Sequence, residues 1–379
     1  MKKSKKQDTI QPADMTEQNK EVVSKDKPAK TKQKPTKDKV KTKEPKKKEK
    51  QPFTRRSLAS LCVLMVLGIA TGSVVGVWFK KNLLGSSLPP PDYASMSEAE
   101  LRDDAFDIAV TQGYSTKKPF KEKNSIINAF ISAEYNLSNF ATSYYTYTNG
   151  IVDTIAQQYI YSEKIYDGTT FYGSSISAGI ISVGELALYD PTQPDDITVV
   201  VGSNINKKTT SSKISCILDN CPYHNQSKYI YDVTYSNSKA TKQTMEQYRK
   251  IMGIAPDTIV PYIVSSKTVI NDPSQTFKKV TDKDGNECYN FQIVLDPQTS
   301  VKNYVNQMSH MSGLNDLPAF TSVVINVSLT MVDGRIYFKT FDIDEHYSIK
   351  YGILTPQCNG RSHQEFVINK PVTIPALAA

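Results

Sequence analysis

The sequence lacks the residue patterns on which most common catalytic sites are built. It has only four histidines among 379 residues, and it contains no Gly-rich phosphate loop, no G-x-S-x-G nucleophile elbow and no zinc-protease motif. Active sites also assemble from distant residues, so missing motifs alone do not exclude catalysis. Because nothing in the pattern favours an enzyme, we expect a protein without catalytic activity, without a cofactor and without a bound metal ion.

Cysteine is also scarce, and no C-x-x-C spacing is present. That absence argues against a thioredoxin-type redox centre and against a zinc ribbon. A zinc site at Cys216, Cys221 and His224 would still need a fourth ligand. Disulfides are the favoured interpretation, with free thiols and a metal site as the alternatives. The simplest of the three pairings joins Cys216 to Cys221 and Cys288 to Cys358.

Negative charge is scarce in residues 1–56, which hold 20 Lys or Arg against 8 Asp or Glu. Apolar residues are scarce there too, so this tail cannot bury enough surface to offset chain entropy, and we expect it to be disordered. It has no aromatic interleaving and no recognisable nucleic-acid module. The composition therefore favours a topology signal with attraction for anionic lipid over nucleic-acid binding.

Charge is absent altogether from residues 57–79, SLASLCVLMVLGIATGSVVGVWF. As a helix these residues span roughly 35 Å, enough to cross a bilayer with some tilt. A cleaved signal peptide has a shorter apolar region, of about 7–15 residues. Basic residues before the run outnumber Lys80 and Lys81 after it, so we expect a single-pass protein in the cell membrane, with a cytoplasmic tail and an extracytoplasmic C-terminal part.

The apolar run spaces its glycines regularly, with Gly68, Gly72 and Gly76 on one helical face. Small residues at this spacing allow close helix–helix contact, so the face is a candidate for self-association in the membrane. The alternative is that these glycines reflect only the high glycine content of membrane helices. Residues 80–95 then contain three consecutive prolines and form an extended linker. The remaining residues, 96–379, are long enough for one large β-rich domain.

Secondary-structure signals within this domain predict a few helices and about eleven antiparallel strands. Helices are expected at 97–113, 122–140 and 239–253. Residues 142–177 are rich in Tyr, Thr and Ile, and their Asn149-Gly150 and Asp167-Gly168 dipeptides predict hairpin turns. Further strands are predicted at 196–203, 228–235, 260–270 and 275–281.

The C-terminal third carries the clearest pattern. Strands are expected at 288–296, 323–332, 335–351 and 363–368, with a turn at Asp333-Gly334. Between the first two lies a helix with one apolar face, which would cover a face of the sheet. In the DIDEH stretch, Asp342, Asp344 and His346 share one face of a strand, and we expect that face to be solvated rather than a cation site. The apolar face of the helix comprises Val301, Tyr304, Val305, Met308 and Met311.

This succession of elements resembles the LolA-like group, with the related LppX and LprG lipoproteins. The resemblance is carried by GIVDTIAQQYIYSEKIYDGTTFYGSSIS and by the run from CYNFQIVLDPQTSVKNYVNQM through FTSVVINVSLTMVDGRIYFKTFDI, and it covers roughly residues 118–370. It implies a strongly curved antiparallel sheet of about eleven strands, a half-barrel with covering helices. It also implies a bacterial extracytoplasmic module that binds acyl chains, lipoproteins or glycolipids. The membrane helix and the four cysteines depart from that group.

Two functional hypotheses follow from the sequence. The first is a membrane-anchored binding module for a lipid, an acyl chain or a lipidated partner at the envelope of a Gram-positive bacterium. The second is a non-catalytic bitopic subunit of an envelope complex with no ligand pocket. A continuous apolar cavity would favour the first, and a filled core with an exposed apolar patch would favour the second.

Overall fold

The structure, a computed structural model, describes residues 98–102, 122–179, 183–202, 204–213, 227–234, 240–312, 316–350 and 354–375. The basic tail, the apolar run 57–79 with its glycine face, and the Cys216–Cys221 loop lie outside these residues. Among the residues that are described, no helix combines the length and the apolar character needed to cross a membrane.

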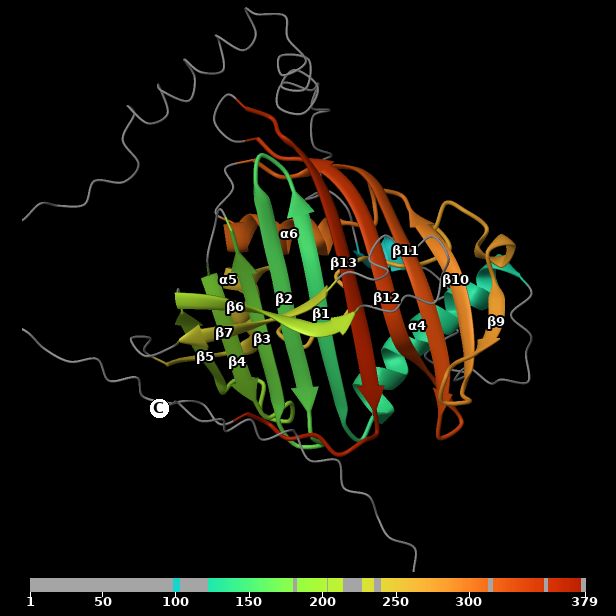
Figure 1. Cartoon of the computed structure of the whole chain (residues 1–379), viewed down its shortest axis with the longest axis horizontal. Coiled ribbons are helices and arrows are strands. Elements are labelled where there is room, and N and C mark those ends of the chain that lie inside the picture. The colour runs from blue at the N-terminus through green and yellow to red at the C-terminus, as the bar shows by residue number, and fades with distance from the viewer. Residues whose placement is uncertain are drawn as a thin grey trace, which may run out of the picture. The chain divides into compact units, whose positions relative to one another are not determined.

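One open antiparallel sheet of eleven strands dominates the described part of the chain (Figure 1). Its order is β8-β5-β4-β3-β2-β1-β13-β12-β11-β10-β9, so the last strand inserts between β1 and β12 and joins two meanders. Strands β6 and β7 form a separate two-stranded hairpin. The strands are β1 Tyr144–Asp153, β2 Gln157–Tyr166, β3 Phe171–Ala178, β4 Val183–Tyr189, β5 Ile197–Gly202, β6 Asn204–Lys213, β7 Ser227–Thr234, β8 Thr241–Gln243, β9 Lys278–Thr281, β10 Glu287–Leu295, β11 Ala319–Val332, β12 Arg335–Ser348 and β13 Gln357–Ile368.

The predicted turn at Asp333-Gly334 is confirmed, and it joins β11 to β12. Asp333 has φ 51° and Gly334 has φ 77°, as the two central residues of a tight hairpin turn require. The turn at Asp167-Gly168 is also confirmed, with a positive φ of 99° at Gly168 and the Asp167 carboxylate accepting hydrogen bonds from the backbone N–H groups of Thr169 and Thr170.

The predicted turn at Asn149-Gly150 is wrong. Both residues lie within β1, where Asn149 pairs with Tyr161 on β2 and with His363 on β13. Strand β1 is central, so its ladder continues through the dipeptide, and the chain reverses at residues 154–156 instead. The sequence signal for a turn is local, and pairing on both sides of the strand outweighs it.

The predicted strand at 260–270 is also wrong, because apart from a single bridge at Val269 this segment has no strand partner. Val260, Tyr262, Val264 and Val269 are nevertheless buried against the core, whereas Ile270 is exposed. The helix at 122–140 is confirmed, and the one at 239–253 is shorter than predicted, since β8 occupies part of the range. The labelled helices are α4 Lys123–Phe140, α5 Met245–Met252 and α6 Lys302–Ser312, with a 3-10 turn at Pro273–Gln275.

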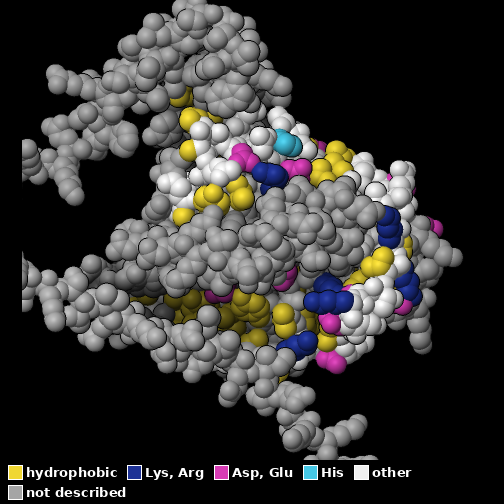
Figure 2. Space-filling model, viewed as in Figure 1, with side chains coloured by type: hydrophobic (Ala, Val, Ile, Leu, Met, Phe, Trp, Pro, Cys, Tyr) yellow, Lys and Arg dark blue, Asp and Glu magenta, His cyan; other side chains and the backbone are white. Residues whose placement is uncertain are grey.

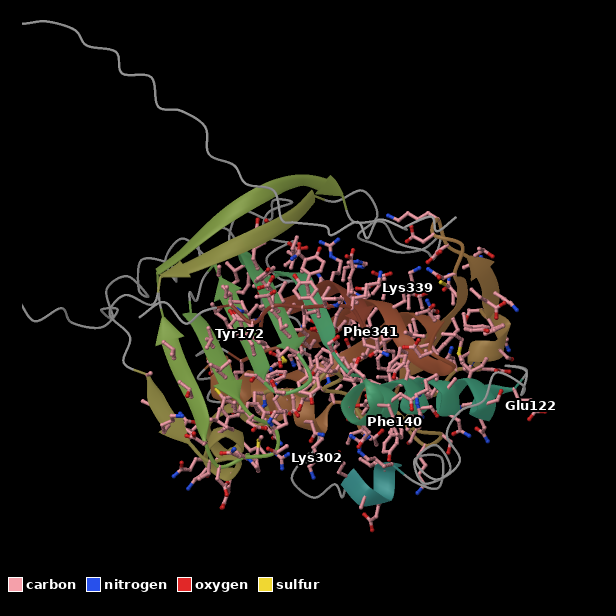
Figure 3. The ribbon with its side chains drawn as sticks, turned by 90° about the horizontal axis from the view of Figure 1, so that it is seen from below. Glu122, Phe140, Tyr172, Lys302, Lys339 and Phe341 are labelled. Carbon is pink, nitrogen blue, oxygen red and sulfur yellow. The ribbon has the colours of Figure 1, made fainter. Side chains whose placement is uncertain are left out.

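The two faces of the sheet have different neighbours. Helices α4 and α6 lie on one side, here called the inner face, and the β6–β7 hairpin lies on the other, the second face (Figures 1 and 3). The main apolar cluster fills the inner face, where Phe130 of α4 packs against Phe338 and Phe341 of β12. The second face carries smaller apolar clusters over β1–β5, and hydrophobic side chains gather there in Figure 2.

Candidate functional site

Helix α6 covers the inner face with the apolar residues that the sequence singled out. Val301, just before the helix, and Val305 are completely buried, and Tyr304 and Met308 pack against the core cluster. The side chain of Met311 lies outside the described structure. Figure 3 shows α6, beginning at Lys302, on the same side of the sheet as α4. That the helix covers a cavity stays a prediction.

Beneath α6 lies a buried carboxylate that the sequence analysis missed. Glu345 of β12 is 4% exposed. The hydroxyl of Tyr262 donates to Glu345 Oε2 at 2.6 Å, and the hydroxyl of Tyr304 donates to Oε1 at 3.0 Å. The two tyrosine rings contact each other edge to face, with centroids 5.2 Å apart. The carboxylate therefore joins the cover helix, the 260–270 segment and the sheet.

Glycine at position 360 makes room for this carboxylate. Gly360 of β13 pairs directly with Glu345. A Cβ atom at position 360 would lie 2.5 Å from Glu345 Oε1 and 2.7 Å from its Cγ. Because real Cβ atoms do not approach this closely, any other residue would displace the carboxylate from its tyrosines.

The environment of Glu345 favours its neutral form. Burial raises the pKa of Glu345 to about 7 and outweighs the two tyrosine hydrogen bonds, which lower it. The same burial and the nearby carboxylate raise the pKa of Tyr262 and of Tyr304 well above the usual value. A carboxyl group with a pKa near neutrality in an apolar interior is a common mark of a functional site.

Two further ionisable groups lie on the inner face, the buried Glu185 and the half-buried Lys164. Burial raises the pKa of Glu185, which accepts a hydrogen bond from the Tyr248 hydroxyl of α5. Burial lowers the pKa of Lys164 to about 8, and its ammonium group donates to the backbone carbonyl of Thr258. Each of these groups links a strand to the segment that covers it, as Glu345 does.

The acidic face of the DIDEH stretch is only partly solvated, so that expectation is corrected. Asp342 is 3% exposed, because its side chain lies on the second face against buried His363. His346 is exposed and bonds to Asn359 at 2.6 Å. Within the described ranges, no group of three or more potential ligands is arranged to hold a metal ion.

The expected Cys288–Cys358 disulfide is wrong, since both cysteines are buried free thiols. Cys288 lies on β10 and Cys358 on β13, with β11 and β12 between them. Strands are spaced by about 4.8 Å, so these two positions are about 14 Å apart across the sheet, whereas a disulfide needs Cα atoms about 4.4–6.8 Å apart. Cys216 and Cys221 lie outside the described residues.

Alternation along β12 could have identified Glu345. Phe341, Ile343 and Tyr347 alternate along the strand and face the core. Glu345 lies on the same face, so its carboxylate is an exception among apolar side chains. His363 gave no such signal, because its partner Asp342 comes from another strand.

No protein-family model, no curated protein and no solved structure matches this chain. Its function is therefore inferred from its own residues and their arrangement.

Proposed function

We propose that the chain is a non-catalytic binding module, anchored in the bacterial cell membrane by residues 57–79, that holds a lipid, an acyl chain or a lipidated partner on the inner face of a LolA-like half-barrel. The eleven-stranded antiparallel sheet with helices on one face supports this proposal. In it, α6 acts as a removable cover, and an acyl chain replaces its apolar contacts when the helix lifts.

The observation that carries the proposal is the way α6 is attached. Val301, Val305 and Met308 pack in the apolar cluster, and Tyr304 donates a hydrogen bond to the buried carboxyl group of Glu345. Apolar contacts are non-directional, so an acyl chain can replace them at little cost. The Glu345–Tyr304 bond is directional, and we assign it the role of a latch that selects the closed position of the helix.

A second candidate is the bitopic interaction subunit without a pocket. The observation that favours it is the complete burial of Val301 and Val305 within one continuous apolar cluster. A helix packed in this way also completes a filled core, and then the chain would act through its surface.

Native mass spectrometry of the full chain, released from lipid nanodiscs, separates the two candidates. The binding module is expected to retain one adduct of lipid mass that is lost on denaturation. A chain that carries no adduct, and gains none when incubated with a fatty acid, would exclude the binding module and leave the interaction subunit.

The latch gives a sharper version of this test. Tyr304→Phe removes the hydroxyl that bonds to Glu345 and leaves the apolar volume unchanged, so we expect exchange of a fluorescent fatty acid to quicken about three- to tenfold. The matched control is Tyr166→Phe, which removes a hydroxyl that bonds to the Gly168 carbonyl at an exposed turn. Equal exchange rates in both variants would contradict the role of the latch.

A further inference from the structure

The C-terminal end of the described chain lies on the second face as a short arm. Strand β13 ends at Ile368, and the chain reverses at Asn369, which has φ 52°. The arm, residues 371–375, follows this turn, and in Figure 1 the red trace leaving β13 runs across the lower ends of β1 and β2. Val372 and Ile374 are half-buried, and the three residues around them are exposed. Burial of every second side chain is typical of an extended segment that lies flat on a surface.

The arm covers an apolar row that crosses β1 to β4 on the second face. Val372 and Ile374 pack against one of the two small apolar clusters of that face. The members of the row lie on neighbouring strands, and each pairs in register with the next. The apolar row comprises Tyr145 of β1, Ile165 of β2, Tyr172 of β3 and Leu188 of β4.

The turn before the arm is held firmly by hydrogen bonds. The backbone N–H of Thr142 donates to Asn369 Oδ1 at 2.9 Å, and Asn369 Nδ2 donates to Asp333 Oδ2 at 2.8 Å. The hydroxyl of Ser143 donates to the carbonyl oxygen of Lys370 at 2.7 Å. These bonds fix the chain as far as residue 370.

The arm itself is held only by its apolar side chains. Among the described residues, no hydrogen bond involves residues 371–375. Pro371 and Pro375 also lack the N–H group that strand pairing requires. The arm can therefore leave the apolar row without breaking a directional bond, and the bonded turn remains in place when it does.

The segment that fits the apolar row is visible in the structure, and a second copy of the chain carries the same segment. Exchange of arms between two copies would keep every contact that the arm makes within one chain. Five extended residues span roughly 16 Å, so the second copy must lie beside the turn. Val367 pairs with Tyr145 at that end of the row and is 37% exposed, so a copy docked there would also cover an apolar side chain that the row leaves open.

We propose that the apolar row is an interface for a second copy of this chain, in which two copies exchange their C-terminal arms. Within a single chain the arm occupies its own row at an effective concentration on the order of millimolar, so it limits association until it is displaced. The interface is on the opposite side of the sheet from α6, and it does not depend on the lipid site proposed there.

The test uses two full-length variants with complementary defects, purified in detergent and labelled with a donor and an acceptor dye. Val372→Asp/Ile374→Asp places charges on the buried side of the arm and leaves the row vacant. Leu188→Asp places a charge in the row and leaves the arm free. Energy transfer between the two variants is expected to give a dissociation constant at least tenfold lower than that of either variant with itself.

The pairs of like variants measure every other association, including any through residues 57–79. The matched control is Thr373→Asp, on the exposed side of the arm. Its own arm still covers its row, so with Leu188→Asp it should associate no more tightly than the like pairs. The proposal is overturned if the complementary variants also associate no more tightly than the like pairs.

A peptide of residues 369–377, NKPVTIPAL, gives a second measurement should thermal unfolding show that Leu188→Asp does not fold. Fluorescence anisotropy is expected to show that it binds Val372→Asp/Ile374→Asp at least tenfold more tightly than the original chain, whose row is already occupied. No binding, or equal binding to both chains, would show that the row accepts only the arm of its own chain and would overturn the proposal.

Discussion

Glu345 and Gly360 depend on each other, because the carboxylate occupies the volume that a side chain at position 360 would need. Gly360→Ala places a methyl group against the Glu345 side chain and breaks its bonds to Tyr262 and Tyr304. We expect a loss of about 1–3 kcal/mol in the free energy of unfolding, as for other overpacked cores. Urea unfolding measures this loss.

A double-mutant cycle shows whether the loss comes from this pair. In a Glu345→Ala background the obstruction is gone, so Gly360→Ala should cost much less there than in the original chain. Equal costs in the two backgrounds would mean that Gly360 is required for another reason.

Residue-scale predictions from sequence succeed where the preference is local and fail where partners come from distant strands. Asp333-Gly334 forms its turn because both residues accept positive φ and no other strand competes. Asn149-Gly150 has the same local preference, yet Asn149 pairs with His363, which is 214 positions away in the sequence. No residue close to Asn149 in the sequence indicates that partner.

At the scale of elements, the end of α5 supports α6. Gly253 closes α5 in the left-handed conformation, with φ 79°. A Cβ there would lie 2.7 Å from the carbonyl carbon of Asn306 and 2.8 Å from the backbone nitrogen of Gln307. Both atoms belong to the backbone of α6 and cannot move aside as a side-chain end can.

Gly253→Ala is therefore expected to destabilise the chain and to loosen α6. The left-handed conformation alone costs about 1–2 kcal/mol for a residue with a Cβ, and contact with the α6 backbone adds about 1–3 kcal/mol. Gly285→Ala is the matched control, because Gly285 has φ 84° and nothing within 4 Å of its added Cβ. Hydrogen exchange should quicken in α6 for Gly253→Ala only, and equal effects would show that α5 does not support α6.

The elements that the sequence predicted best are long and periodic. In β11, Ile325, Val327 and Leu329 alternate with Asn326, Ser328 and Thr330, and these three apolar residues and Val323 are buried as expected. Residues 260–270 have the composition of a strand, but they run over the inner face as a segment without a ladder. Composition measures their tendency to be buried, and it does not reveal whether a neighbouring strand is free to pair with them.

At the scale of the whole described domain, both faces of the sheet carry buried side chains, but these differ in chemistry. The inner face is mostly apolar with isolated carboxyl groups, while the centre of the second face buries polar side chains, among them Asn326, Asp342 and His363. Alternation in the sequence separates the two faces correctly. It cannot distinguish a polar face in water from a polar face under cover, which is why Asp342 was expected to be solvated.

This distribution of buried groups fixes how stability depends on pH. Burial raises the pKa of Glu345 to about 7 from an ordinary value of 4.5, raises that of Glu134 to the same level and raises that of Glu185. Between the unfolded and folded pKa values, the folded chain binds more protons than the unfolded chain, so the free energy of unfolding falls as pH rises from about 4.5 to 7. His363 has the same sign, since its pKa is raised and its contribution is lost as pH rises from about 6.5.

Glu345→Gln isolates one part of this dependence, because the amide keeps the shape of the side chain and cannot ionise. A rise of about 2.5 pKa units corresponds to about 3 kcal/mol, so the original chain should lose up to that amount through Glu345 between about pH 5 and pH 7.5. The variant should lose correspondingly less, so its advantage over the original chain in the free energy of unfolding should grow with pH.

Urea unfolding at the two pH values measures the difference. Glu246→Gln, at an exposed carboxylate of α5, is the control, and it should keep the pH dependence of the original chain. If Glu345→Gln also keeps that pH dependence, Glu345 is ionised in the folded chain at neutral pH, and its bonds to Tyr262 and Tyr304 then hold a charge beneath α6.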